Sequence, residues 1–356
     1  MKRKKRWLVA LIVVVAILLV TGIAVSVFLQ TETGKAFRNM LHLFDNNVSI
    51  VERNEQPKAT IPPVTSDEEL EFLDTVPDDD SYDVELEDPE EMTAPIVADI
   101  YKTDQKHEDI INVLVLGQDG KHYRETSNRT DVMLLASYNT STSELKLVSF
   151  QRDSYVPITG YDRWNRLNAC YHFGGAGMAI NTFNDLFDLD IQYYVTVAFS
   201  EFKTLVDAVG GVELEVSSKE ASQIGCRSGR VTLNGEQALS YCRTRATGNG
   251  DWGRAERHRK FMIALITKIR SEFTLEMANE LMTFAGDYVR TNIPVTKLAS
   301  LGFTLMQNRD LHFSTAKVPF DDTWQYARKR GASVLVFDIE ENARLLNEFL
   351  YGEEDS

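Results

Sequence analysis

From residue 108 onward, apolar residues follow two patterns along the chain. A nearly continuous apolar run of strand length lies at residues 110–116, and mainly apolar segments of strand length follow at residues 132–136, 145–150, 193–197, 211–216 and 334–337. Runs of this kind are typical of buried strands whose sheet is covered on both faces. Apolar residues at helical spacing predict helices over residues 178–187, 202–209, 261–269 and 341–350. Strands interleaved with helices predict an α/β fold, a single layered α/β/α domain with a mixed central sheet.

The N-terminal pattern is different. Residues 7–29 form an uncharged apolar run, and five basic residues precede it within residues 1–6. About twenty apolar residues cross a bilayer as a helix, whereas the apolar part of a cleaved signal peptide has roughly 7–15. Basic residues favour the cytoplasmic side. We therefore predict a single-pass cell-membrane protein with a cytoplasmic tail (1–6), a transmembrane helix (7–29) and an extracytoplasmic remainder. A signal peptide is the alternative.

Most of the formal net charge of −15 lies in residues 30–107. This segment combines acidic residues with prolines and has little periodic hydrophobicity, which predicts a disordered or extended acidic linker. Repulsion between its like charges would extend it. Residues 108–352 are then expected to form the one catalytic domain.

Several functional classes lose support. The chain has no Gly-x-Ser-x-Gly elbow, no phosphate-loop lysine motif and no His-Glu-x-x-His motif, and its six histidines are scattered. The three cysteines, Cys170, Cys226 and Cys242, cannot all pair within one molecule, so we expect buried, unreactive thiols. A cytoplasmic tail of residues 1–6 is too short to bind DNA as a regulator.

Arginine is selected over lysine in one segment. Residues 220–259 contain seven arginines and no lysine, and guanidinium groups offer the planar paired donors that fit phosphate or carboxylate. We expect Arg243 and Arg245 at the end of a strand and Arg254 and Arg257 at the start of a helix. Two elements would then direct paired arginines at a diphosphate or polyanion. For any single arginine, an ion pair with one of the chain's many acids is the alternative.

Two aspartates suggest a metal site. Asp119 follows the first predicted strand and Asp131 opens the second, so their carboxylates can meet at one end of the sheet. Mg²⁺ prefers oxygen ligands and shares its coordination with water and phosphate. The alternative is that each aspartate forms a turn or caps a helix.

Six short motifs follow one another in a fixed order. They are Gly117-Gln-Asp119, Asn128-Arg-Thr-Asp131, Phe150-Gln-Arg152-Asp153, Arg166-Leu-Asn168, the stretch from Leu233 to Arg243-Thr-Arg245, and Asp251-Trp-Gly-Arg254-Ala-Glu-Arg257. Together they closely resemble the LytR-CpsA-Psr family of Gram-positive cell-wall enzymes, over about residues 110–272. A single membrane helix ahead of the domain is also usual in that family.

The resemblance implies a Mg²⁺-dependent phosphotransferase at the outer membrane face. Such enzymes transfer a glycopolymer, a teichoic acid or a capsule-like polysaccharide, from undecaprenyl diphosphate to N-acetylmuramic acid of peptidoglycan, forming a phosphodiester. The implied partners are the polyprenyl diphosphate-linked glycan, the peptidoglycan acceptor and the membrane, with no nucleic acid. A hydrolase of lipid diphosphates and a non-catalytic membrane-tethered regulator remain as alternatives.

The resemblance also implies roles for individual residues. Asp119 and Asp131 match the acidic pair associated with Mg²⁺ and the diphosphate. The residues expected to bind the substrate are Arg129, Arg152, Asn168, Phe199, Arg243, Arg245, Arg254 and Arg257. Charge stabilisation carries most of the catalysis in phosphoryl transfer. Catalytic roles are therefore expected for Arg152, Arg243, Arg245 and Arg254.

Two expectations carry alternatives. Asp153 either accepts the proton of the attacking sugar hydroxyl or is a buried partner that holds an arginine in place. Phe199 belongs to a set of apolar residues that either line a slot for the polyprenyl tail or belong to the core. The other members of that set are Phe173, Met178, Phe202 and Leu205.

The chain departs from the family's usual pattern at several positions. Lys121 stands where arginine is common, His258 where glutamine is usual, and Gln151 where proline is usual. His258 lies within reach of the expected diphosphate, so it could change pH dependence or acceptor choice. We interpret Gln151 as neutral.

Overall fold

The computed structural model describes residues 49–52, 70–73, 98–118, 130–161, 163–198, 202–244, 250–274, 277, 281, 289–307 and 310–352. None of the helices in these ranges has the length and apolar character needed to span a membrane. The predicted cytoplasmic tail (1–6) and transmembrane helix (7–29) lie outside the described residues.

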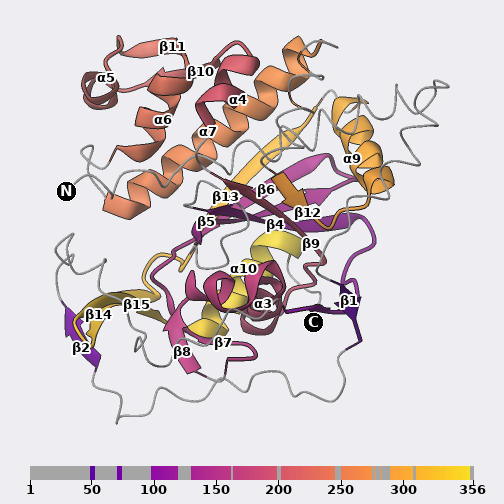
Figure 1. Ribbon diagram of the computed structural model, residues 1–356, viewed down its shortest axis with the longest axis vertical. Helices are drawn as coiled ribbons and strands as arrows, with labels where there is room; N and C mark the ends of the chain where they lie inside the picture. The colour runs from indigo at the N-terminus through magenta and orange to yellow at the C-terminus, as the bar shows by residue number, and fades with distance from the viewer. Residues whose placement is uncertain are drawn as a thin grey trace.

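A six-stranded mixed sheet forms the centre of the domain (Figure 1), in the order β12-β9-β4-β5-β6-β13. Its strands are β4 (Ile110–Gln118), β5 (Thr130–Asn139), β6 (Glu144–Phe150), β9 (Tyr193–Ala198), β12 (Val289–Thr291) and β13 (His312–Val318). Strands β4, β5 and β6 pair antiparallel, whereas β9 runs parallel to β4 and β13 runs parallel to β6. The predicted α/β fold with a mixed central sheet is confirmed.

Helices pack on both faces of this sheet (Figure 1). One face is covered by α4 (Phe202–Ala208), α6 (Gly235–Arg243), α7 (Gly250–Glu272) and α9 (Val295–Gln307), and the other by α3 (Ala169–Phe187) and α10 (Ile339–Tyr351). Neighbouring residues of β4 pack on opposite faces of the sheet. Val113 and Val115 lie in the core beneath α4, α6, α7 and α9, whereas Leu114 and Leu116 lie in the core beneath α3 and α10. Side chains alternate between faces along a strand, so a strand buried on both faces is a continuous apolar run.

Smaller sheets and one short helix, α5 (Ser218–Ile224), surround this centre. The sheets pair β7 (Tyr155–Ile158) with β8 (Arg163–Arg166), β10 (Val212–Val216) with β11 (Gly229–Leu233), β14 (Trp324–Lys329) with β15 (Ala332–Phe337) and β2 (Leu70–Leu73), and β1 (Ile50–Val51) with β3 (Ile100–Tyr101).

Three of these strands come from the segment predicted as an acidic linker, residues 30–107. Strand β2 extends the β14–β15 sheet, and β3 is bound to α3, where Asn181 Nδ2 donates to Asp99 O at 2.9 Å and Asn181 Oδ1 accepts from Tyr101 N at 2.8 Å. A Cβ at Gly177 would lie 1.7 Å from Ala98 O, so only glycine lets this segment cross the helix. Parts of the segment are therefore integral to the fold, while the boundary at residue 108 stays a prediction.

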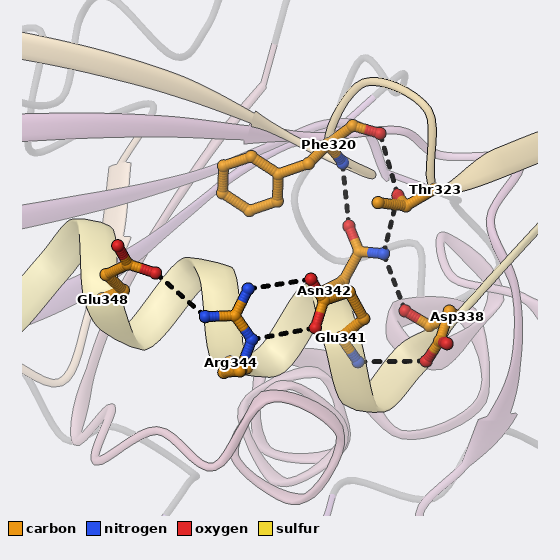
Figure 2. Close-up of polar contacts among 7 residues, drawn as sticks. All are labelled: Phe320, Thr323, Asp338, Glu341, Asn342, Arg344 and Glu348. Atoms are coloured by element: carbon orange, nitrogen blue, oxygen red, sulfur yellow. Dashed lines mark hydrogen bonds and ion pairs between the residues drawn. The ribbon is translucent and has the colours of Figure 1, made fainter. Parts of the chain in front are cut away.

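Asn342 fastens the C-terminal helix α10 to the loop before β14 (Figure 2). Its fully buried side chain accepts from Phe320 N at 2.8 Å and donates to Thr323 Oγ1 at 2.9 Å and to Asp338 O at 2.7 Å. Asp338 caps the same helix, because its Oδ1 accepts from Glu341 N at 3.0 Å. The loop that leads into Trp324, the first residue of β14, is thus held by the first turn of α10.

Replacing Asn342 by leucine should lower the free energy of unfolding by about 2–4 kcal/mol, since three hydrogen bonds are lost and Phe320 N–H is left without its acceptor. Urea unfolding at 25 °C measures the change. Arg344→Ala is the control, because Arg344 makes exposed ion pairs with Glu341 and Glu348 on the same helix (Figure 2) and should leave stability close to that of the wild type. Equal losses of unfolding free energy in Asn342→Leu and Arg344→Ala would contradict the role given to Asn342.

Candidate functional site

The site is built around the turn that follows strand β6. Gln151 N donates to Val318 O on β13 at 2.9 Å, Asn168 N donates to Arg152 O at 3.2 Å, and Leu335 N on β15 donates to Asp153 O at 2.8 Å. Three elements that are distant in sequence therefore fix the backbone of this turn. The backbone N–H of Asn168 thus holds the backbone of Arg152, while the substrate-binding role of the Asn168 side chain stays a prediction.

Two carboxylates join three arginines at this turn. Arg152 Nε donates to Asp153 Oδ2 at 3.1 Å, and Arg166 Nη1 donates to Asp153 Oδ1 at 3.4 Å. Asp251 Oδ1 lies 3.0 Å from Arg254 Nη2, and its Oδ2 lies 3.7 Å from Arg152 Nη2. Asp153 and Arg166 are each 3% exposed. Three guanidinium groups thus alternate with two carboxylates around the turn, and guanidinium donors suit phosphate or carboxylate oxygens.

A cavity opens between this turn and the first turns of helix α7. The described residues that line it are Val132, Met133, Ser149, Phe150, Gln151, Arg152, Asp251, Arg254, Ala255 and His258. Strands β5 and β6 contribute its apolar wall, and the helix contributes charged groups. The structure thus brings together Arg152 and Arg254, two residues predicted to bind the substrate. It also confirms that Arg254 and Arg257 lie in the first turns of a helix.

An aromatic contact between Trp252 of α7 and Trp324 of β14 holds the first turn of α7. The rings of Trp252 and Trp324 lie 4.8 Å apart, and Lys317 Nζ lies 4.9 Å from the centre of the Trp252 ring. Such contacts favour a defined orientation. Trp252 neighbours Asp251, so the loop fastened by Asn342 also positions this carboxylate.

Arg243 is the last residue of the neighbouring helix α6. The prediction that it lies at a strand end is therefore wrong. Asn234 caps this helix: its side chain accepts from Gln237 N at 2.9 Å, and Gln237 Oε1 accepts from Asn234 N at 3.3 Å. This is a capping box, whose Asn-x-x-Gln signal was present in the sequence.

Arg257, predicted to bind the substrate, ties α7 to its neighbours. It donates to Thr244 O and its Nη1 lies 4.0 Å from Glu220 Oε1. Arg257 is not one of the described residues that line the cavity. The structure therefore places it beside the site and not on the cavity wall.

Several predicted site residues lie outside the described residues: Asp119, Arg129, Phe199 and Arg245. Asp131 lies in β5, but its side chain is not described. Gly117 of β4 lies opposite Val132 of β5, and the next residue of β4, Gln118, lies opposite Thr130, so that Asp131 has no residue opposite it. Asp131 is therefore the extra residue of a β-bulge, a feature that redirects a side chain at a sheet edge.

Arg166 and Asp251 belong to the site but are not among the predicted site residues. Asp251 precedes Arg254 by three residues, a spacing that brings side chains together on a helix, so this ion pair could have been predicted. Arg166 reaches Asp153 because Arg166 pairs with Tyr155 in the β7–β8 ladder. No sequence signal fixed that register in advance.

The cysteines are free thiols, as expected, and two of them are buried. Burial raises the pKa of the Cys170 thiol to about 12 and raises that of Cys242 further. Neither is a thiolate at neutral pH, so neither serves as a nucleophile.

His258 is held neutral on the cavity wall. Its ring Nε2 lies 3.2 Å from Cys242 O. Burial, and then the charge of Arg254, hold the pKa of this imidazole well below its ordinary value of 6.5.

The low pKa of His258 predicts a pH dependence of stability. Below pH 6.5 the unfolded chain binds a proton at His258 that the folded chain does not bind, so stability present above pH 6.5 is lost as the pH falls. One such proton changes the free energy of unfolding by at most about 1.4 kcal/mol per pH unit. Urea unfolding from pH 7.5 to 5.0 should show a steeper loss in the wild type than in His258→Gln. Parallel curves would contradict this.

Asp153→Asn should lower the free energy of unfolding by roughly 3 kcal/mol, because it leaves buried guanidiniums without their full counter-charge. Chemical denaturation measures the loss. Asp321→Asn, which removes an exposed partner of Lys317, should change stability little. Full stability in Asp153→Asn with loss of activity would instead favour the role of proton acceptor.

The chain is similar to two teichoic acid transferases over about half its length. It is 37% identical over 186 residues to the polyisoprenyl-teichoic acid–peptidoglycan teichoic acid transferase TagU of Enterococcus faecalis, a match that covers 51% of this chain and 61% of that relative. It is 34% identical over 185 residues to the TagU protein of Bacillus mycoides, covering 51% of this chain and 60% of that relative. The matched region thus spans about three fifths of these relatives.

Solved structures share the fold. TagT bound to LIIa-WTA has a TM-score of 0.57 and 23% identity, covering 68% of this chain and 90% of that chain. TagV of Bacillus subtilis has a TM-score of 0.57 and 24% identity, covering 70% of this chain and 100% of that chain.

The family model described as LytR_cpsA_psr matches residues 79–349. The match includes the turn after β6, the cavity and all of α7, and it confirms the resemblance carried by the six motifs. The chain belongs to the LytR-CpsA-Psr family.

Proposed function

We propose that this protein is a phosphotransferase that moves a glycopolymer, such as a teichoic acid, from a polyprenyl diphosphate carrier to peptidoglycan. The observation that carries the proposal is the pair Arg152 and Arg254. They come from separate elements, share the carboxylate of Asp251 and line one cavity. The names of the TagU relatives support the choice of donor and acceptor.

The arginine pair suits phosphoryl transfer. Negative charge spreads over phosphate oxygens as the bond to the leaving group breaks, and fixed cations lower the barrier most when they need no reorganisation. Asp251 orients both guanidiniums before the substrate arrives. The apolar wall of Val132, Met133 and Phe150 strengthens their field by lowering the local dielectric constant.

We assign Asp153 a positioning role. Its carboxylate is buried between Arg152 and Arg166, at 3.1 and 3.4 Å. Both oxygens of this carboxylate are engaged by guanidinium groups, which holds the two arginines in place relative to the turn. Asp153 therefore serves the reaction by orienting Arg152.

We propose further that Mg²⁺ is held by Asp119 and Asp131. Gln118 Oε1 and Thr130 Oγ1, next to these two residues in sequence, are buried oxygens without a hydrogen-bond partner among the described residues, and oxygen donors suit this ion. Within the described ranges, no group of three acidic, histidine or cysteine side chains could hold a metal. Bound Mg²⁺ would neutralise charge on the diphosphate.

We also propose that residues 7–29 form a transmembrane helix, with residues 1–6 in the cytoplasm and the α/β/α domain outside the cell. The apolar run and the basic residues before it support this arrangement. A polyprenyl diphosphate stays in the membrane, so an anchor keeps the enzyme close to its donor.

The test uses the full-length protein in detergent with a short-chain prenyl diphosphate glycan, peptidoglycan oligomers and Mg²⁺, and identifies products by mass spectrometry. We expect a glycan joined to the acceptor by a phosphodiester. Arg254→Ala should lower kcat/KM at least about a hundredfold, because it removes a fixed charge from the transition state. Arg344→Ala, on the exposed face of α10, should leave the rate unchanged.

The products separate the alternatives. Release of free glycan phosphate, with no glycan attached to the acceptor, would indicate that the protein is a hydrolase and not a transferase. Donor binding without turnover would favour a regulator. Equal rates in Arg254→Ala and the wild type would remove the arginine pair from the mechanism.

A further inference from the structure

Gln151 lies on the wall of the cavity with a side-chain amide that no described residue satisfies. Its side chain is buried, with 6% of the residue exposed, and within the described part of the chain its Nε2 has no hydrogen-bond partner. Its backbone is fully engaged, because its N donates to Val318 O at 2.9 Å and its O accepts from Ser154 N at 3.2 Å. The position is therefore fixed while the amide is left without a partner.

Folding alone does not explain an amide at this position. A buried N–H without an acceptor destabilises the folded state, whereas an apolar side chain of similar length carries no such penalty. Buried polar groups without partners are uncommon in proteins, and each one calls for a reason. Here Gln151 lines a cavity together with charged groups, and a ligand in that cavity would supply the missing acceptor.

The surroundings of the amide indicate the chemistry of that ligand. Arg152 follows Gln151 directly, and Arg254 lines the same cavity from α7. A neutral N–H donor flanked by two guanidiniums selects an acceptor oxygen that carries negative charge. The apolar residues Val132 and Phe150 strengthen such a bond by excluding water.

We propose that Gln151 is a binding residue for the diphosphate group, and that its Nε2 donates to a phosphate oxygen lying between Arg152 and Arg254. The identity of the donor rests on the proposed function, but the recognition itself requires only a diphosphate. The amide adds direction without adding charge, so it orients the oxyanion that the guanidiniums attract. This replaces the interpretation of Gln151 as neutral.

The experiment measures two quantities on the full-length protein in detergent micelles: the Tm without ligand, and the Kd for inorganic diphosphate and for farnesyl diphosphate, each with Mg²⁺. Gln151→Met keeps the length of the side chain and removes the donor. We expect it to bind both diphosphates about ten- to hundredfold more weakly, the effect of one hydrogen bond to a charged group. Its Tm without ligand should equal or exceed that of the wild type, because a buried amide without a partner has been removed.

Two further variants sharpen the result. Gln151→Glu matches the side chain in size but places a carboxylate beside the phosphate, and it should abolish binding. Gln325→Met, at an exposed position on β14, should change neither quantity. Gln151→Leu repeats the test should the methionine variant fail to fold.

A lower Tm without ligand combined with unchanged affinity would make Gln151 a structural residue and overturn the proposal. A wild-type protein that binds neither diphosphate would overturn it as well. Wild-type protein that binds both diphosphates but attaches no glycan to peptidoglycan would remove the proposed function and leave this inference standing.

Discussion

The carboxylates of Asp153 and Asp251 are the constraint on which the site depends. A buried guanidinium destabilises the fold unless a counter-charge lies against it, and these two carboxylates supply that charge to Arg152, Arg166 and Arg254. The partners come from the turn after β6, from β8 and from α7. These three elements must pack in one arrangement for all five groups to be paired, so the forces that fold the domain also orient the arginines.

The outer contacts of the site extend this constraint to the C-terminus. Asn342 fixes the loop before β14, this loop leads directly into Trp324, and Trp324 packs on Trp252 beside Asp251. Helix α10, which contributes no residue to the described lining of the cavity, thereby supports the shape of the site. Rigid support of this kind is what charge stabilisation requires, because a guanidinium that must move before it binds loses part of its effect.

Much of the fold follows from local pattern. Strands β4, β5, β6 and β9 are apolar runs long enough to be recognised, because both faces of the sheet are covered. Strand β2 was missed, since four residues in an acidic segment become a strand only when β14 lies beside them. Arg243 lies in a helix and not at a strand end. The alternation of Arg243 and Arg245 is typical of a strand, but the cap at Asn234 starts a helix that runs to Arg243.

The site was predictable to the extent that its residues lie in motifs. Arg152 and Arg254 could be named from sequence because guanidinium chemistry identifies them. Arg166 could not, since its role depends on the register of a short hairpin. Gln151 was passed over because its significance is the lack of a partner for its amide, which only the packed structure reveals.

The pairing of β1 with β3 changes the reach of the molecule. Residues 49–51 are bound to the domain, so at most residues 30–48 separate the domain from the proposed anchor at residues 7–29. A segment of this length spans at most roughly 65 Å, far less than a segment running to residue 107 could span. In the proposed arrangement, the domain therefore stays close to the bilayer and reaches only peptidoglycan that lies near the membrane.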